Sequence, residues 1–351
     1  MKVKASLKDP IDGPNFIFHW GLLYNGNDDS EIMLGGPMPP ILEVHDLVKK
    51  YGDLTAVKGI SFEVQEGEIF SLLGPNGAGK TTTISILSTL FSPTSGDAFI
   101  CGHSVTKEPM AVKQAIGVVP QEIALYDDLT ALENLNFWGK MYGLSGSELS
   151  TRIDEVLEQI DLKERAKQRI KTYSGGMKRR VNIGVGLLHK PRLLFMDEPT
   201  VGIDPQSRRA ILDSVKELNR SGMTILYTTH YMEEAQELSD RVGIIDYGVL
   251  IALGTQKELT AQVGEMDTLI LHLGENEDPI NLAEVLSTLP GVLQANPTDH
   301  EVAIVTPSAE ELLAPVVSRT NELGIKIYSI DMREPNLEAV FLQLTGRALR
   351  E

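Results

Sequence analysis

The pattern of apolar and polar residues changes several times along this chain. The stretch "ILEVHDLVKKYGDLTAVKGISFEVQEG" alternates between the two kinds and breaks at Tyr51–Asp53 and Gln65–Gly67, which predicts strands joined by turns. "EIFSLLG" is then almost continuously apolar from Ile69 to Leu73, as expected for a central strand buried on both faces. Residues 192–199 and 223–230 have the same character, so we expect two further buried strands.

Helical stretches fill the intervals between these strands. They are expected at 131–143, 147–160 and 205–220, and another helix follows the glycine-rich loop after Leu73. Strands that alternate with helices predict an α/β fold, with a three-layer core around a mostly parallel sheet.

The pattern changes again after about Gly264. Strand-like and helix-like segments follow in the order βαββαβα, which predicts a small α+β domain of the ferredoxin-like kind. In chain order these segments are "DTLILHL", "INLAEVLSTL", "VLQANP", "HEVAIV", "AEELLAPVVSRTNEL", "IKIYSIDM" and "LEAVFLQLTG". No catalytic constellation is visible in this part, and we interpret it as a structural, regulatory or docking module.

Residues 1–40 differ from the rest of the chain. They contain several Gly, Pro, Asn and Asp residues and end in "GGPMPP", a composition typical of a linker, so we expect a poorly ordered extension. Alternatively, residues 15–24, "NFIFHWGLLY", form an interfacial or partner-binding segment. No run of about eighteen apolar residues occurs, so we do not expect the chain to span a membrane by itself.

Length and composition narrow the class of protein. A chain of 351 residues exceeds the usual size of one core, and we expect two domains, at 41–260 and 266–351. The formal net charge of −17 argues against a nucleic-acid-binding surface, although "KRR" at 178–180 is a local basic spot. The single cysteine, Cys101, cannot form an internal disulfide, which fits a reducing cytosolic compartment.

A phosphate-binding loop is the clearest chemical motif. "GPNGAGKT" fits G-x-x-x-x-G-K-[ST] and lies between a predicted strand and a predicted helix, the context that this motif requires. Gly74, Gly77 and Gly79 permit a tight loop whose backbone N–H groups face the phosphates. Lys80 supplies positive charge to the β- and γ-phosphates, and the Thr81 hydroxyl can coordinate Mg²⁺. The alternative is a glycine-rich turn in front of a helix, and the position of the motif disfavours it.

Two carboxylates end the buried strand "LLFMDE". Asp197 is placed to hold Mg²⁺, and Glu198 to orient and deprotonate an attacking water. Carboxylates at the end of a buried strand are costly unless something positive neutralises them. A pair of helix N-caps is the alternative, but a phosphate loop in the same chain favours the catalytic interpretation.

The stretch "YSGGMKRR" has the features of a second anion site. Ser174 can be the N-cap of a helix, and Gly175 and Gly176 let a ligand approach bare backbone N–H groups. Such a helix terminus offers unpaired donors and the positive end of the helix dipole. Since the phosphate loop is already complete, the residues alone leave open whose phosphate this second site would hold.

The motifs occur together in the order found in one family. "YGDLTAVKGISFEV", "GPNGAGKTT", "VVPQE", "YSGGMKRR", "LLFMDEPTVGIDP" and "TTH" resemble the nucleotide-binding subunits of ABC transporters, over about residues 41–255. The phosphate loop alone would not separate this family from kinases, GTPases or helicases. The C-terminal part, with "FLQLTGRALRE", is similar to the accessory domain of drug-resistance and ABC-2-type exporter ATPases.

This resemblance implies roles for residues outside the loop. Tyr51 matches the aromatic residue that stacks on adenine, although it also fits an ordinary tyrosine at a strand end. Gln121 in "VVPQE" matches the glutamine that reaches Mg²⁺ and the attacking water. Asp204 in "GIDP" matches a residue that organises the dimer interface, and it also fits a plain turn or helix start. His230 matches the switch histidine that contacts the γ-phosphate, where a lone histidine is more often structural.

The resemblance also explains the second anion site. In such proteins the "SGG" helix terminus of one subunit covers the ATP held by another, so Ser174 and Gly176 are expected to donate to the γ-phosphate across the interface. Tyr173 and Met177 depart from the commoner "LSGGQ" but leave phosphate capture intact, and Met177, in place of the polar Gln, puts the ribose contact of that Gln in doubt. A core-facing stripe follows at spacings of three and four, namely Met177, Val181, Val185 and Leu188.

The complete site implied by these matches has four parts. The expected ATP contacts are Tyr51, Gly74, Pro75, Asn76, Gly77, Ala78, Gly79, Lys80, Thr81 and Thr82. The expected contacts to ATP of the other subunit are Ser174, Gly175, Gly176 and Asp204. The expected Mg²⁺ ligands are Thr81, Gln121 and Asp197, and the expected catalytic residues are Lys80, Gln121, Glu198 and His230.

We therefore interpret the chain as the ATP-binding and ATP-hydrolysing subunit of an ABC exporter of the ABC-2 type, in the multidrug, lipid or polysaccharide class. Two copies, or one copy and a related subunit, would sandwich two ATP–Mg²⁺, and dimer closure would drive a separate integral-membrane permease. The chain would lie peripherally on the cytoplasmic face of the membrane. Residues 123–144 are the expected coupling surface, or else their apolar residues are helical core.

Two other functions stay open on the sequence alone. A soluble ABC ATPase of translation or DNA repair would commonly carry paired cassettes or long coiled-coil insertions, and this chain shows neither. An importer subunit would differ mainly in its accessory domain and partner. A pseudo-ATPase is disfavoured because Lys80, Asp197, Glu198 and His230 are all present.

Overall fold

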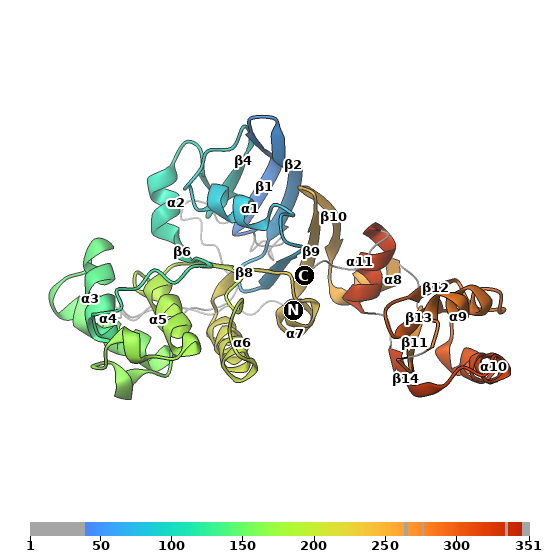
Figure 1. Cartoon of the computed structure of the whole chain (residues 1–351). Coiled ribbons are helices and arrows are strands. Elements are labelled where there is room, and N and C mark those ends of the chain that lie inside the picture. Colours follow the sequence, from blue (N-terminus) through green and yellow to red (C-terminus); the bar gives the residue numbers. More distant parts are fainter. Residues whose placement is uncertain (1–38, 263–265, 276, 334–335, 346–351) are drawn as a thin grey trace, which may run out of the picture. The chain divides into compact units, whose positions relative to one another are not determined.

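The computed structural model describes residues 39–262, 266–275, 277–333 and 336–345 (Figure 1). The predicted extension, including its apolar segment 15–24, lies outside these ranges except for its last two residues. Within the described ranges, no helix combines the length and apolar character needed to cross a membrane.

A six-stranded sheet carries the first core. Its order is β10-β9-β3-β8-β7-β6, in which the strands from β9 to β6 are parallel and β10 is antiparallel to β9. The strands are β3 (Ile69–Leu73), β6 (Ile116–Val119), β7 (Leu193–Asp197), β8 (Thr224–Thr229), β9 (Arg241–Asp246) and β10 (Val249–Gly254). All residues of β3, β7 and β8 are buried, which confirms the three buried strands predicted from the sequence.

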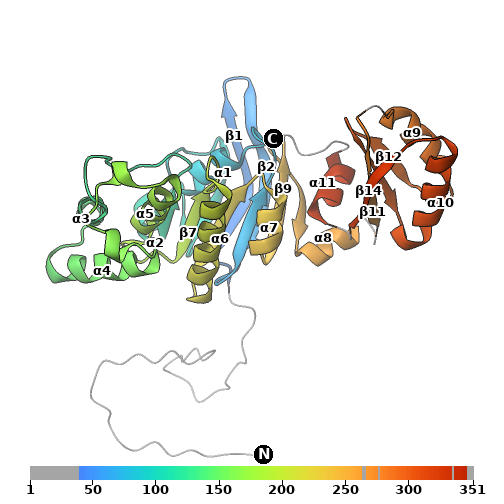
Figure 2. The same cartoon turned by 60° about the horizontal axis from the view of Figure 1, so that its bottom comes forward.

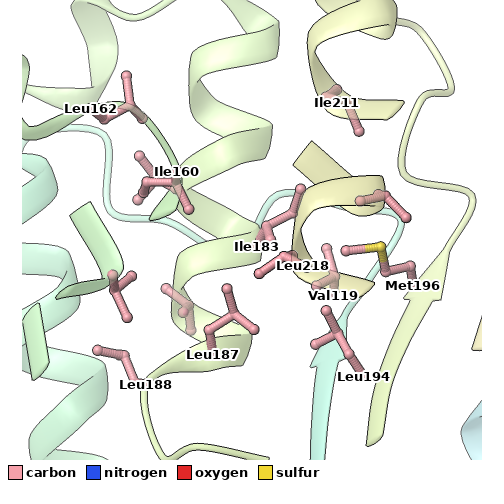
Figure 3. Close-up of a cluster of buried hydrophobic side chains, with 14 of the residues drawn as sticks. Val119, Ile160, Leu162, Ile183, Leu187, Leu188, Leu194, Met196, Ile211 and Leu218 are labelled. Carbon is pink, nitrogen blue, oxygen red and sulfur yellow. The ribbon is translucent and has the colours of Figure 1, made fainter. Parts of the chain in front are cut away.

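The two faces of this sheet are covered differently. Met196 packs with α5 (Gly175–Leu187) and α6 (Pro205–Arg220), which lie beside each other in Figure 2. Figure 3 shows this cluster from close by. The next residue back along the strand, Phe195, belongs to the opposite cluster, which includes α1 (Lys80–Leu87). Because successive side chains of a strand alternate between faces, the sheet is enclosed between two layers, as predicted.

An antiparallel sheet, β2-β1-β4-β5, contributes to the cluster around Phe195. Its strands are β1 (Leu42–Tyr51), β2 (Leu54–Val64), β4 (Ser95–Ile100) and β5 (His103–Ser104). The hairpin between β1 and β2 turns at Gly52 and Asp53, where the sequence pattern breaks. The chain then turns at residues 65–67 and enters β3, again as predicted.

Helices α3 (Ala131–Met141) and α4 (Gly146–Gln159) share the core cluster of α5. Helix α3 begins with a capping box, in which Thr130 and Glu133 each accept the other's backbone N–H through the side chain. The other helices of this part are α2 (Pro109–Ala115), α7 (Met232–Leu238) and α8 (Gln256–Gln262), with 3₁₀ turns at Lys163–Arg165 and Ile170–Thr172. The helices predicted at 131–143, 147–160 and 205–220 are all present, with small differences at their ends.

The C-terminal part forms a separate antiparallel sheet of order β12-β13-β11-β14. Its elements are β11 (Asp267–Leu273), α9 (Pro279–Leu286), β12 (Gln294–Pro297), β13 (Glu301–Thr306), α10 (Ala309–Glu322) and β14 (Ile327–Arg333). Leu271 and Ile304 point to the face that α9 and α10 cover, and Figure 2 shows both helices on one side of the sheet. This strand order is the ferredoxin-like one that the βαββαβα pattern predicts.

Helix α11 (Leu337–Thr345) does not share the apolar cluster of α9 and α10. Leu337 and Phe341 share an apolar cluster with Met232 of α7 and Leu259 of α8. Helix α11 therefore contacts α7, which lies between β8 and β9, and α8, which follows β10. The ranges 41–260 and 266–351 of the two expected domains stay a prediction.

Candidate functional site

The glycine-rich loop, residues 74–81, connects β3 to helix α1, as predicted. It passes so close to β9 that a Cβ on Gly74 would lie 2.1 Å from the backbone oxygen of Ile245. Gly77 and Gly79 have φ angles of 80° and 109°, a region that favours glycine. No side chain caps the start of α1, so its N–H groups are available to an anion.

Lys80 is buried at the end of this loop, with 3% of its surface exposed. Its Nζ donates to the carbonyl oxygens of Gly74, at 2.6 Å, and Pro75, at 3.0 Å. It also lies 2.9 Å from Oε1 of Glu198. A buried ammonium group costs several kcal/mol unless it is paired, and here three oxygens match its three donors.

The remaining loop residues differ in exposure. Pro75 and Ala78 are buried, Asn76 and Thr81 are exposed, and Thr82 is partly buried. Thr81 is nevertheless held from one side, because its hydroxyl donates to Oδ1 of Asp197 at 3.2 Å.

Asp197 ends the buried strand β7, as the sequence predicted, and faces Thr81. The Thr228 hydroxyl donates to the same carboxylate oxygen at 2.7 Å. Burial raises the pKa of Asp197 and nearby Glu198 raises it further, while these two hydroxyls and Lys80 oppose the shift. A hydroxyl and a carboxylate suit a hard cation such as Mg²⁺. Among the described residues no group of three or more His, Cys, Asp or Glu could hold a metal.

Buried Glu198 and partly buried His230 form a pair beside Lys80. Oε2 of Glu198 lies 3.0 Å from Nδ1 of His230, and only 5% of Glu198 is exposed. The backbone of Glu198 has a φ of 44°, a strained conformation for a non-glycine residue that costs about 1–3 kcal/mol. Its N–H donates to both the carbonyl and the hydroxyl oxygen of Thr228, which hold the conformation in place.

Tyr51 lies at the end of β1, and 43% of it is exposed. Its ring meets the ring of Phe91 edge to face at a centroid distance of 6.3 Å. The ammonium group of Lys49 lies 5.1 Å from the Tyr51 centroid and 5.6 Å from that of Phe91. An exposed aromatic face of this kind can accept a base, and adenine stacking stays a prediction.

Gln121 is exposed and follows β6. Its carbonyl oxygen accepts from Arg179 at 2.6 Å, and that of Pro120 accepts from the same guanidinium at 2.7 Å. Asn182, one turn further along α5, holds Pro120 and Ala124 with longer bonds of 3.4 Å. The backbone around Gln121 is therefore attached to the helix that begins at the "SGG" motif.

The "SGG" motif lies at the start of α5, where the sequence placed it. Ser174 is the N-cap, and its hydroxyl oxygen accepts the N–H of Met177 at 3.2 Å. Ser174 and Gly175 are exposed, so the helix terminus is open to a ligand. Gly176 is buried against α6, and a Cβ there would lie 2.4 Å from Cβ of Ser207.

The two departures from the commoner motif have structural reasons. Tyr173 is buried in the α5 core cluster, and its hydroxyl donates to the carbonyl of Arg165 at 2.6 Å. Met177 packs against the same cluster. The predicted stripe is confirmed, since Val181, Val185 and Leu188 are buried there.

Asp204 is the N-cap of α6, and its carboxylate accepts the N–H of Ser207 at 3.0 Å. This hydrogen bond holds the pKa of Asp204 below its usual range. The plain interpretation of "GIDP" as a helix start is therefore correct. Asp204 is also exposed. It lies near the "SGG" motif, because Ser207, in the first turn of the helix that Asp204 caps, contacts Gly176. Its role at a dimer interface stays a prediction.

The structure thus brings part of the predicted site together. Hydrogen bonds and ion pairs connect Lys80, Thr81, Asp197, Glu198 and His230. Within the described ranges, no such bond joins the side chains of Tyr51, Gln121 or Ser174 to that group.

Sequence reasoning missed two residues that support the site. Thr228 donates its hydroxyl to the Asp197 carboxylate and accepts the backbone N–H of Glu198, and only its place before "TH" at a strand end could have indicated it. The sequence places Arg179 in a local basic spot, but it is 2% exposed and its guanidinium donates to backbone carbonyls. Its neighbours Lys178 and Arg180 pair with Asp127 and Asp161.

A strand, a phosphate loop and a helix, with acidic residues at the end of another parallel strand of the same sheet, are the common core of phosphate-loop nucleoside triphosphatases. Within that class, the family profile described as ABC transporter matches residues 57–201. The chain belongs to the ABC transporter family and is an ATP-binding subunit.

Curated relatives cover almost the whole chain. The chain is 50% identical to the linearmycin resistance ATP-binding protein LnrL of Bacillus subtilis (strain 168), over 89% of this chain and 100% of that protein. It is 39% identical to the doxorubicin resistance ATP-binding protein DrrA of Mycobacterium tuberculosis (strain ATCC 25618 / H37Rv), over 91% and 95%. The Nod factor export ATP-binding protein I of Ralstonia nicotianae (strain ATCC BAA-1114 / GMI1000) is 38% identical, over 89% and 96%.

Solved structures match the cassette. An ATP-binding subunit of an ABC transporter is 33% identical, with a TM-score of 0.57, over 64% of this chain and 93% of that one. A dimeric ATP-binding cassette in a post-hydrolysis state, bound to ADP and Pi, is 28% identical, with a TM-score of 0.55, over 61% and 98%. These comparisons confirm the fold class and the family inferred from the sequence, and they make the chain an ATPase subunit of an ABC exporter.

Proposed function

We propose that Glu198 is the general base of ATP hydrolysis and that Lys80 restrains it until nucleotide binds. The observation that carries this proposal is the buried contact of 2.9 Å between the two side chains. A carboxylate oxygen that is held by an ammonium group is not available to a water molecule. Phosphates entering the loop attract Lys80, and Glu198 is then left with His230 and free to accept a proton from water.

Mg²⁺ is the proposed cofactor of this site, held by Thr81 and Asp197. Their oxygens already converge at 3.2 Å. When bound, the ion neutralises charge on the β- and γ-phosphates. Gln121 is the proposed third ligand, and its attachment to α5 through Arg179 gives it a route to respond to events at the "SGG" terminus.

The "SGG" terminus is proposed to serve a second copy of the chain. Ser174 and Gly175 are exposed at a helix N-terminus, which suits a phosphate group. We propose that Ser174, Gly175, Gly176 and Asp204 contact ATP held by the phosphate loop of the partner subunit. Dimer closure on two ATP molecules then supplies the motion for transport. The relative solved as a dimeric cassette supports this arrangement.

The membrane partner is proposed to be a separate permease, which places this chain on the cytoplasmic face of the membrane. Part of segment 123–144 presents apolar side chains to solvent: Tyr126, Phe137 and Met141 are 49%, 37% and 68% exposed. The first two rings pack edge to face at 5.1 Å. Ala131 and Leu135 of the same segment are buried, so it combines helical core with the proposed coupling surface. Purification from native membranes should recover a hydrophobic subunit with the chain; recovery of the chain alone, in the soluble fraction, would contradict this partner.

The transported compound is proposed to be a drug to which export gives resistance. The relatives named above are named for linearmycin and doxorubicin resistance and for Nod factor export. Residues 266–351 are proposed to form the accessory domain of this exporter type.

The test of the proposed function is Glu198→Gln. The amide keeps the shape of the side chain but cannot accept the proton, so turnover should fall about 10³-fold or more, as expected for loss of a general base. ATP binding should persist, and light scattering should show a dimer with ATP and Mg²⁺. Glu217→Gln, on an exposed position of α6, is the matched control and should keep full activity. Turnover that survives Glu198→Gln would contradict the assignment.

A further inference from the structure

Glu234, in α7, is a buried carboxylate outside the site described so far, with 2% of its surface exposed. Its Oε1 accepts from the Thr200 hydroxyl at 2.6 Å. Its Oε2 accepts from the hydroxyls of Tyr227 and Thr229, both at 2.9 Å. A buried carboxylate costs several kcal/mol unless its oxygens are satisfied, and three hydroxyl donors satisfy this one.

One of these hydroxyls fixes the turn that carries His230. The Thr229 oxygen donates its proton to Glu234 and accepts the backbone N–H of Tyr231 at 2.9 Å. A hydroxyl has a single proton, so donation to the carboxylate leaves its lone pairs for that N–H. His230 lies between the two residues joined in this way, and its Nδ1 faces Glu198.

The other carboxylate oxygen, Oε1, bonds to the segment that leads to Asp204. Thr200 belongs to the segment between Glu198 and Asp204, and it is 1% exposed. Arg208, in the first turns of α6, has its Nε 3.8 Å from Oε1 of Glu234.

The same arginine completes a second connection to the histidine. The guanidinium of Arg208 lies 4.3 Å from the ring centroid of Tyr231. The ring of Tyr231 lies 4.1 Å from the ring of His230. The start of α6 and the turn after β8 are therefore joined both by the Glu234 carboxylate and by packed side chains.

We propose that Glu234 is a positioning residue for His230 and couples it to the segment 199–204. The inference rests on the proposed function, in which that segment meets the partner subunit. Thr200 and Thr229 bind one carboxylate, so a displacement of the interface segment changes the support of the histidine. Contact with the partner at Asp204 is in this way linked to the residue that faces Glu198.

Glu234→Gln tests the inference. The variant keeps the shape, but an NH₂ group replaces one acceptor, so at least one hydroxyl loses its partner. We expect kcat to fall about 10–100-fold, the size of a small misplacement of a reacting group. KM for ATP should stay within about twofold, because Glu234 contacts none of the predicted ATP-binding residues. Unchanged kcat would overturn the inference.

Thr229 provides a matched pair in case Glu234→Gln folds poorly. Thr229→Val removes the hydroxyl and should reproduce the loss of kcat, whereas Thr229→Ser keeps the hydroxyl and should retain activity within about threefold. The double variant Glu234→Gln/Thr229→Val should lose less than the product of the two single losses, because both act through one unit. Equal kcat for the Val and Ser variants would overturn the inference.

Two controls separate positioning from loss of structure and from failure of the proposed function. Tyr227→Phe removes another donor from the same carboxylate but leaves the Thr200 and Thr229 bonds, so it should lower the melting temperature more than kcat. In a Glu198→Gln background, Glu234→Gln should leave ATP-dependent dimerisation unchanged, whereas loss of dimerisation would show a structural role and overturn the inference. Retained turnover of Glu198→Gln by itself would instead reject the proposed function.

Discussion

At the scale of single residues, two glycines of the phosphate loop are required for different reasons. A Cβ on Gly74 would collide with a backbone oxygen of β9 at 2.1 Å. At Gly77 no atom lies within 4 Å of the added Cβ, and only the φ of 80° opposes a side chain. We predict that Gly77→Ala lowers the free energy of unfolding by about 1–2 kcal/mol, the cost of a left-handed alanine.

Gly74→Ala should cost more, because the backbone of β9 is paired on both sides and cannot move aside without breaking that pairing. Urea denaturation of both variants without nucleotide measures the difference. Equal losses, or a larger loss for Gly77→Ala, would contradict the steric explanation.

The sequence predicted the residues with a motif and missed those without one. Gly74, Lys80 and Asp197 could be assigned because spacing and context identify a phosphate loop and its acidic strand. The contact of Gly74 with Ile245 could not be predicted, because it depends on which strand lies beside β3. Nor could the burial of Arg179, since a basic triplet after a helix start is usually a solvated face.

At the scale of elements, the contact between α5 and α6 determines how the "SGG" terminus is presented. Gly176 touches Ser207 so closely that a Cβ would lie 2.4 Å from Cβ and 2.5 Å from Oγ of the serine. We predict that Gly176→Ala lowers stability by about 1–3 kcal/mol, the usual cost of overpacking. Ser207→Gly removes the side chain that would collide, so the double variant should recover most of this loss.

Thermal unfolding of the single and double variants checks this prediction. Ser207→Gly alone is the control for the cost of a glycine in a helix, about 1 kcal/mol. If the double variant is no more stable than the sum of the single losses predicts, the two helices do not meet through this pair.

The elements themselves were predicted better than their ends. The pattern gave helix 205–220, and α6 has those bounds because Asp204 caps it and Pro205 fits its first position. The helix predicted at 131–143 ends instead at Met141. Tyr142 is its C-cap, and the N–H of Gly143 bonds to the carbonyl of Lys140, three residues back, in place of the four of an α-helix. Helix ends depend on such local bonds, which apolar spacing does not report.

At the scale of the whole molecule, the residues of the site fall into two groups that no hydrogen bond or ion pair joins directly in the described part of the chain. One group surrounds Lys80, and the other lies at the starts of α5 and α6. Arg179 and Glu234 connect the groups only indirectly, through the backbone near Gln121 and the turn at His230. We expect this separation if each group completes a site together with the other group of a second copy. A mixture of two defective variants can test whether the sites are shared between copies.

The two defective variants are Lys80→Ala, which removes the cation of the phosphate loop, and Gly175→Asp, which places a carboxylate at the start of α5. A side chain fits at position 175, because the nearest neighbour of an added Cβ is Ile203 at 3.5 Å. Each variant alone should be nearly inactive. A heterodimer of the two retains one intact site, so an equal mixture should recover about a quarter of the wild-type rate if copies pair at random and sites act independently. Gly175→Asn, neutral and of the same size, should be less inhibited than Gly175→Asp. A mixture no more active than its components would show that both groups act within one chain.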